Sequence, residues 1–207
     1  MNQIPQKHAF GFMALLPLAL SLAVFVPATT EAKEPKSISA RPSNWAKPID
    51  LPGVPNLYRV SKNLYRSAQP TSQGMVNLEK KLGIKTIINL RLFHSDRDEI
   101  KGTELEYIHI PLKTWKVKKK HVLRFLEAVT DLKKQPVLVH CNHGADRTGT
   151  MVAFYRMVVQ GWDKSAALDE MKHGGFNYHS IWINLVDLIE DANIDEYKVI
   201  ISNHDSP

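Results

Sequence analysis

The chain has 207 residues, of which 43% are hydrophobic and 23% are charged, and its formal net charge is +6. This composition excludes a disordered chain and is typical of one globular domain with a substantial core. The basic residues are not interleaved with aromatic residues, so the sequence does not resemble a nucleic-acid-binding module, whereas the moderate positive charge suits anionic ligands.

The N-terminus has the pattern of a secretory signal peptide. Lys7 precedes an apolar run over residues 10–26, and small residues suited to cleavage follow as far as Ala32. The run is short for a membrane span and contains Pro17. We therefore expect export with removal of residues 1–32 and no stable membrane insertion afterwards. An uncleaved N-terminal anchor is the alternative.

Residues 33–55 are rich in proline and lack hydrophobic periodicity, which predicts a linker or an N-terminal arm. We place the globular domain at residues 56–195 and a C-terminal tail at residues 196–207. The sequence does not indicate an oligomeric state.

Apolar strands alternate with amphipathic helices along the domain. We predict strands over residues 56–60, 64–67, 84–90, 107–110 and 136–140, of which the first two form a hairpin. We predict helices over residues 72–82, 117–132, 150–159, 164–171 and 178–190. This alternation predicts an α/β domain with a mostly parallel central sheet of about five strands flanked by helices. Ligands bind such sheets beyond the carboxyl ends of the strands, and Cys141 lies at that edge.

Residues 140–149 join a buried apolar strand to a mostly buried helix. Successive loop N–H groups and a helix N-terminus make a concave site for an anion. Arg147 adds a planar fork that suits two phosphate oxygens, and Gly144 permits a backbone conformation that a Cβ would hinder. We predict a phosphate-binding loop formed by Asn142, His143, Gly144, Ala145, Asp146 and Arg147.

Cys141 stands at the start of this loop and is the single cysteine of the chain. The positive field of the loop favours its thiolate, and cysteines at helix N-termini can have pKa values lowered to roughly 3.5–7.5. Thr148 is placed to donate a hydrogen bond to the sulfur. A thiolate at the floor of a phosphate site can attack phosphorus and form a phosphocysteine. A lone thiol in an exported chain cannot form an internal disulfide, which supports a role as a nucleophile.

The His-Cys-x5-Arg-Thr-Gly pattern resembles the signature loop of the cysteine-dependent protein tyrosine and dual-specificity phosphatases. With segments 64–70 and 155–176, the likeness covers about residues 56–176 and resembles the exported bacterial dual-specificity phosphatases of the TpbA type. The resemblance implies a protein-tyrosine-phosphatase-like fold. It also implies a periplasmic enzyme, without metal or cofactor, that acts on phosphotyrosine in phosphoproteins, with phosphoserine and phosphothreonine as further candidate substrates. It assigns Cys141 as the nucleophile, Arg147 as the phosphate clamp and Thr148 as the hydroxyl partner of the thiolate.

The general acid that this resemblance implies is missing from its expected position in this sequence. The resemblance places an aspartate in the loop at residues 111–120, which has no carboxylate here and has Trp115 near the expected position. A positioned acid contributes about 10²–10⁴-fold, and its loss favours phenolate over alkoxide as the leaving group. Asp146 is a candidate replacement, because myotubularin-like phosphoinositide phosphatases resemble this chain in having an aspartate there. A solvated or lysine-paired Asp146 is the alternative. Weaker candidate acids are Asp96, Asp98 and His121.

The acid-free loop also carries five lysines: Lys113, Lys116, Lys118, Lys119 and Lys120. Most charge runs are solvated faces, but a basic rim of the site would favour substrates with several phosphates. One alternative function is therefore an inositol-phosphate or phosphoinositide phosphatase. A second is a catalytically weak, phosphate-binding pseudo-phosphatase, since the loop acid is missing.

Two other interpretations of the cysteine loop agree less well with its sequence. A sulfur-transfer enzyme also uses an anionic cysteine loop, but the arginine–threonine pair fits phosphate better. A structural zinc on His140, Cys141 and His143 is disfavoured, because such sites need four ligands at other spacings. We expect His140 to orient the loop through hydrogen bonds rather than to react. We expect Arg66 to fix the loop, with contact to an anionic ligand as the alternative.

Overall fold

The computed structural model describes residues 41–204. The predicted signal peptide, residues 33–40 of the predicted arm and residues 205–207 lie outside the described residues. Within residues 41–204, no helix combines the length and the apolar character needed to cross a membrane.

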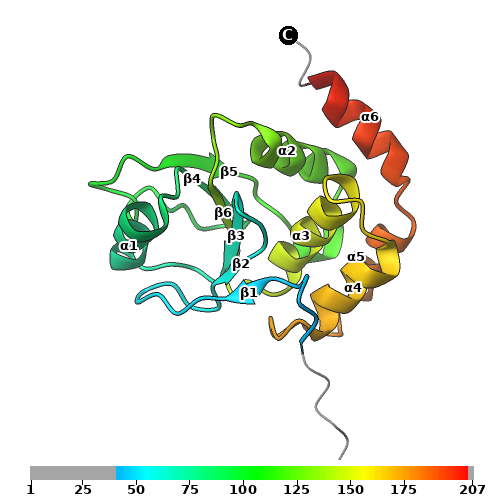
Figure 1. Cartoon of the computed structure of the whole chain (residues 1–207), viewed down its shortest axis with the longest axis horizontal. Helices are drawn as coiled ribbons and strands as arrows, with labels where there is room; N and C mark the ends of the chain where they lie inside the picture. The colour runs from blue at the N-terminus through cyan, green and yellow to red at the C-terminus, as the bar shows by residue number, and fades with distance from the viewer. Residues whose placement is uncertain (1–40, 205–207) are drawn as a thin grey trace, which may run out of the picture. The chain divides into compact units, whose positions relative to one another are not determined.

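A six-stranded sheet forms the centre of the described chain, in the order β1-β2-β3-β6-β4-β5 (Figure 1). The strands are β1 (Lys47–Pro48), β2 (Tyr58–Arg59), β3 (Leu64–Ser67), β4 (Thr86–Asn89), β5 (Glu106–His109) and β6 (Val137–His140). Strands β3, β6, β4 and β5 are parallel, whereas β1 and β2 continue the sheet antiparallel beyond β3. The predicted mostly parallel α/β sheet is confirmed, with β1 as a strand that the sequence pattern did not indicate.

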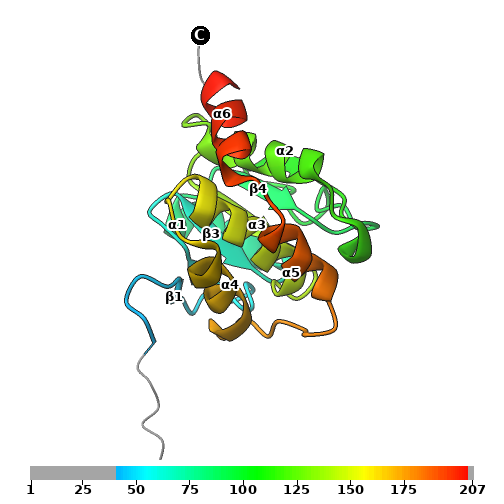
Figure 2. The same ribbon diagram turned by 90° about the vertical axis from the view of Figure 1, so that its right-hand side faces the viewer.

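Six α-helices and one 3₁₀ helix are present in the described residues. They are α1 (Ser72–Leu82), η1 (Thr114–Lys116), α2 (Lys119–Thr130), α3 (Asp146–Val158), α4 (Lys164–His173), α5 (Ile183–Glu190) and α6 (Ile194–His204). Helix α1 lies on one side of the sheet and α2 to α6 lie on the other (Figures 1 and 2). The predicted helix over residues 178–190 begins only at Ile183.

The central strands bury both of their faces because successive side chains point to opposite sides. On β4, Ile87 packs with α1, whereas its neighbour Ile88 packs with α2 and α3. On β6, Leu138 faces the α1 side, whereas Val139 faces the other helices. This two-sided burial explains the continuous apolar runs in the sequence, and it fixes the strand end from which the loop at Cys141 leaves.

The packed domain extends beyond the predicted limits of residues 56 and 195. On the N-terminal side, Ala46 is fully buried and its N–H donates to Glu170 at 2.6 Å. On the C-terminal side, Tyr197 and Ile201 of α6 are buried in the same core as α3. The described parts of the predicted arm and tail are therefore structural parts of the domain.

Candidate active site

Cys141 directly follows the central strand β6, and the loop after it enters α3 at Asp146. Because β6 lies between β3 and β4 and is parallel to both, this loop emerges at the carboxyl edge of the sheet. The Cys141 thiol is free of any disulfide and only 2% of the residue is exposed. The predicted strand–loop–helix arrangement is confirmed.

Neighbouring segments hold the loop carbonyl groups from outside. The Asn142 carbonyl accepts a hydrogen bond from the backbone N–H of Gln69 at 3.1 Å. The His143 carbonyl accepts one from Nδ2 of Asn56 at 2.9 Å. These two bonds turn the first carbonyls of the loop toward the protein.

Arg66 of β3 holds the next carbonyls. Its Nη2 donates to the Gly144 carbonyl at 2.7 Å and lies 3.4 Å from the Ala145 carbonyl. In a planar trans peptide unit the N–H points away from the C=O. The N–H groups of residues 143–146 therefore face the concave side of the loop, and none donates to another described backbone group outside regular helices and strands. This is the arrangement that an anion site requires.

Gly144 allows the loop to lie directly on the end of β3. Its φ is +69°, in the left-handed region, and a Cβ built there would meet Ser67 and Ala68 backbone atoms at 2.5 Å. No other residue type fits this position without a backbone shift, as the sequence predicts.

Arg66 is fully buried beneath the loop. Its guanidinium lies 3.6 Å from the centre of the Phe176 ring, and its Nε and Nη1 atoms have no hydrogen-bond partner among the described residues. Burial lowers the pKa of Arg66 to about 10, against the raising effect of Glu170 and Cys141. The group therefore stays cationic at neutral pH, so it adds positive potential below the loop while it fixes the carbonyls.

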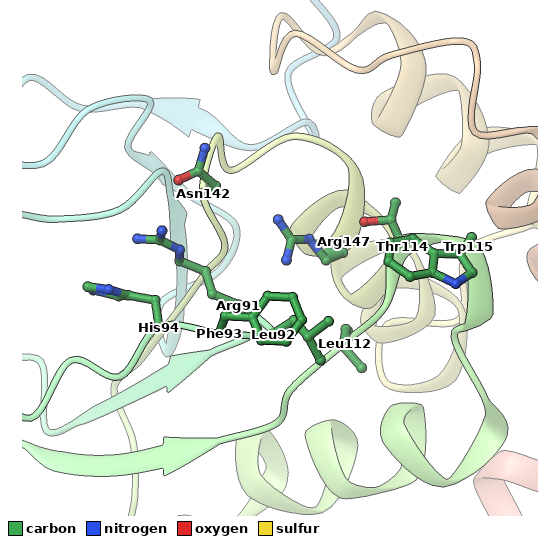
Figure 3. A pocket seen from close by; sticks show the side chains of 9 residues that line it. All are labelled: Arg91, Leu92, Phe93, His94, Leu112, Thr114, Trp115, Asn142 and Arg147. Carbon is green, nitrogen blue, oxygen red and sulfur yellow. The ribbon is translucent and has the colours of Figure 1, made fainter.

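A cleft of about 400 Å³ opens beside the loop (Figure 3). Its lining residues are Arg91, Leu92, Phe93, His94, Leu112, Thr114, Trp115, Asn142 and Arg147. Arg147 enters from the first turn of α3 and Arg91 from the connection after β4. Two arginines and no carboxylate line this cleft, so it suits an anionic ligand.

Thr148 differs from its prediction. Its hydroxyl oxygen is buried and has no hydrogen-bond partner among the described residues, so the predicted bond to the sulfur of Cys141 is not formed. The position of its Cα is fixed by the helical backbone of the first turn of α3. Leaving a buried hydroxyl without a hydrogen-bond partner costs free energy. The Thr148 hydroxyl is therefore available to donate to an anion bound in the loop.

A buried hydrogen-bond chain connects the cleft to His140, the residue before Cys141. Nε2 of His140 lies 2.6 Å from Asp96, and its Nδ1 lies 3.2 Å from the Cys141 carbonyl. Gln69 donates to Asp96 at 2.9 Å and accepts from Arg91 at 2.9 Å. Burial raises the pKa of Asp96. The hydrogen bond and charge of His140, together with the hydrogen bond from Gln69, lower it by more, so the pKa of Asp96 lies below its ordinary value.

This chain corrects the prediction that Asp96 is a candidate acid. Asp96 is fully buried, and its carboxylate is kept ionised by its partners. It positions His140, which in turn contacts the loop as the sequence predicts.

Asp146 is held by a residue that the sequence analysis missed. Its carboxylate accepts from the backbone N–H of His179 at 2.9 Å and lies 2.9 Å from the ring Nδ1 of the same residue. Asp146 does not line the cleft of Figure 3. His179 is 33 residues away in the chain, and no local pattern in the sequence connects the two. The proposed role of Asp146 as the acid remains a prediction.

The other candidate acids lie away from the cleft. Asp98 is exposed, and its hydrogen bond to Lys101 lowers its pKa. His121 accepts from the Lys118 N–H at 3.1 Å at the start of α2, and burial together with nearby lysines lowers its pKa. The carboxylate-free loop carries η1 instead, in which Trp115 is 62% exposed at the rim of the cleft.

The lysine run lines a second, smaller cavity of about 270 Å³. It is formed by Leu92, Pro111, Lys113, Lys116, Lys118, Lys120 and His121. Leu92 also lines the first cleft, so the two cavities adjoin. Lys119 instead pairs with Glu196 of α6.

Comparison with known proteins gives a consistent result. Residues 56–182 match the model of a family described as a DSP-PTPase phosphatase fused to NAD⁺ kinase. The chain is 36% identical to the dual specificity protein phosphatase TpbA of Pseudomonas aeruginosa, over 95% of this chain and 88% of that protein. A more distant relative, the inositol diphosphatase DSP3 of Arabidopsis thaliana, is 29% identical over 67% of this chain and 72% of its own.

Solved structures confirm the fold. The crystal structure of P. aeruginosa TpbA has a TM-score of 0.71 and 36% identity, over 79% of this chain and 99% of that one. A cysteine-to-serine variant of TpbA in complex with phosphotyrosine also has a TM-score of 0.71, with 35% identity over 79% of this chain and 99% of its own. The predicted protein-tyrosine-phosphatase-like fold is therefore confirmed.

Proposed function

Since the chain belongs to the TpbA-like dual-specificity protein phosphatases, we propose that it hydrolyses phosphotyrosine in proteins through a phosphocysteine on Cys141. One observation carries the proposal. The loop between β6 and α3 has its carbonyls bound from outside, which leaves the N–H groups of residues 143–146 facing one concavity. Cys141 begins that loop and Arg147 ends it.

The proposed reaction has two displacements at phosphorus. The loop N–H groups and the fork of Arg147 bind the non-bridging phosphate oxygens. The Cys141 thiolate forms a P–S bond while the bond from phosphorus to the tyrosine oxygen breaks, and the phenolate takes a proton from water. A water molecule then attacks the phosphocysteine, which releases inorganic phosphate and restores the thiolate.

The leaving group sets the expected substrate preference. No carboxylate lines the cleft, and the loop at residues 111–120 has none. Phenolate leaves unassisted more readily than the alkoxide of serine or threonine, and general acid catalysis contributes about 10²–10⁴-fold where it exists. We therefore propose phosphotyrosine as the preferred substrate, with phosphoserine and phosphothreonine turned over more slowly.

A second candidate function rests on the lysine-lined cavity beside the cleft. Its four lysines provide binding partners for further phosphates or for acidic residues near the phosphotyrosine. The inositol diphosphatase relative is consistent with a substrate that carries several phosphates.

Turnover of three substrates tests these proposals: p-nitrophenyl phosphate, a phosphotyrosine peptide and an inositol polyphosphate. We expect Cys141→Ser to be inactive and Arg147→Lys to lose about 10²–10³-fold in kcat/KM. His173→Ala, an exposed position on α4, is the control and should match the wild type. Faster turnover of the inositol polyphosphate than of the peptide supports the second function. If the wild type with its thiol reduced is inactive on all three substrates, both proposed activities are contradicted. The alternative of a phosphate-binding pseudo-phosphatase then remains.

We also propose that the protein is exported to the periplasm. The sequence pattern of residues 1–32 supports this proposal. Cell fractionation followed by N-terminal sequencing of the mature chain tests it. Recovery of the intact N-terminus in the membrane fraction would favour the uncleaved anchor instead.

A further inference from the structure

Three side chains of the β4–β5 connection converge next to the cleft: His94, Asp96 and Glu99. Nε2 of His94 lies 3.4 Å from Oδ1 of Asp96 and 3.1 Å from Oε1 of Glu99. All three potential ligand atoms lie within 4.8 Å of one another. They combine one imidazole with two carboxylates, a donor set that suits Zn²⁺.

The contacts within the cluster lack hydrogen-bond geometry. Nε2 of His94 and Oε2 of Glu99 are buried atoms with no hydrogen-bond partner among the described residues. A shared cation would give Nε2 of His94 a partner. Zn²⁺ binds nitrogen and oxygen at about 2.0–2.1 Å, so the ligands of a tetrahedral site lie about 3.3–3.4 Å apart. The observed separations of 3.1 and 3.4 Å are close to that spacing.

Asp96, the middle residue of the cluster, is already held in place by other groups. Asp96 is fully buried, accepts from Gln69 at 2.9 Å through Oδ1 and lies 2.6 Å from His140 through Oδ2. A carboxylate oxygen has two acceptor positions, so Oδ1 can bind a cation and retain Gln69. Carboxylates that bind metals are commonly oriented by such outer hydrogen bonds.

We propose that His94, Asp96 and Glu99 form a Zn²⁺ site, with water completing the coordination. The cation would cross-link both ends of the segment from His94 to Glu99. Through Asp96 it would be one hydrogen bond from His140, the residue before the nucleophile. The site takes no part in the displacement at phosphorus, so it agrees with the expectation that hydrolysis needs no metal.

Metal binding is measured on the full chain carrying Cys141→Ser, which removes the thiolate as a competing ligand. Calorimetry with Zn²⁺ and visible absorption with Co²⁺ provide two readouts independent of activity. In this background His94→Ala should weaken binding by at least the roughly 10–100-fold that loss of an outer ligand partner causes. Glu99→Gln should act in the same direction. His173→Ala, which removes an exposed histidine paired with Asp169, should bind as the parent does.

Thermal melting adds a third readout, since a ligand that binds the folded state raises the melting temperature. We expect Zn²⁺ to raise it in the parent and in His173→Ala but not in the two cluster variants. Circular dichroism checks that each variant folds. If His94→Ala does not fold, the binding measured for Glu99→Gln decides the result. Absence of Zn²⁺ and Co²⁺ binding, or unchanged binding in the folded cluster variants, would overturn the proposal. The cluster would then be an ion pair of His94 with two carboxylates.

Discussion

Gly144→Ala tests whether the close contact between the loop and β3 sets the catalytic geometry. The added Cβ would lie 2.5 Å from backbone atoms of Ser67 and Ala68, whereas ordinary contact begins at 3.4 Å. Backbone atoms cannot change rotamer, so the loop or the strand must move by about 0.9 Å. A misplacement of about 1 Å at a reacting centre can cost 10²-fold in rate. We therefore expect kcat/KM for p-nitrophenyl phosphate to fall by about that factor.

Gly83→Ala is the matched control for the backbone effect. Gly83 has φ of +65°, close to the +69° of Gly144, but a Cβ there meets nothing within 4 Å. Both variants lose roughly 1–2 kcal/mol of stability, because a Cβ is disfavoured in the left-handed region. Only Gly144→Ala has the additional clash with β3.

The assay measures turnover of p-nitrophenyl phosphate for wild type and both variants, with urea denaturation to confirm that each is folded. Gly83→Ala should retain wild-type kcat/KM when folded. If folded Gly144→Ala stays within about threefold of Gly83→Ala, a rate effect far below that of a 1 Å displacement, the close contact does not set the geometry and the reasoning fails.

Three further predictions concern the surroundings of the site. Glu170→Gln should lower the free energy of unfolding by about 3–5 kcal/mol in urea, because it leaves the buried Arg156, bound at two distances of 2.7 Å, without its counter-charge; a loss below about 1 kcal/mol would contradict this. Thr114→Asp, which places a carboxyl group in the cleft, should raise turnover of a phosphoserine peptide at least about tenfold with little effect on p-nitrophenyl phosphate, and equal effects on both substrates would argue against an acid role. Burial raises the pKa of Asp96, but the hydrogen bond and charge of His140, the Gln69 hydrogen bond and the charge of His94 together leave it lowered in the folded state. Its stabilisation is therefore complete above the unfolded pKa of about 3.9 and is lost as pH falls below it. Asp96→Asn should abolish that component of acid destabilisation in denaturation experiments between pH 7 and 3, and an unchanged pH dependence would show that another group is responsible.

The sequence predicted the site most accurately where the relevant contacts are local. The strand before Cys141 and the helix after it are both apolar and close in the chain, so their junction is visible in the pattern. Helix α6 was missed because its two core residues, Tyr197 and Ile201, gain their burial only against α2 and α3, which are distant in the chain. The pair of Asp146 and His179 was missed for the same reason, since its residues meet only in the folded chain.

The contacts around the loop also explain why a second segment, residues 64–70, resembles the same phosphatases. The sequence predicts that Arg66 holds the loop, but it does not show which groups of the loop this segment contacts. In the structure, Arg66 binds the Gly144 carbonyl and the Gln69 N–H binds the Asn142 carbonyl. The Gln69 side chain also joins Arg91 to Asp96. The N–H groups of the loop face the proposed phosphate site because this neighbouring strand holds the opposite side of the same peptide units. Residues 64–70 therefore act through the loop, and the proposed phosphate site depends on two chain segments rather than on the cysteine loop alone.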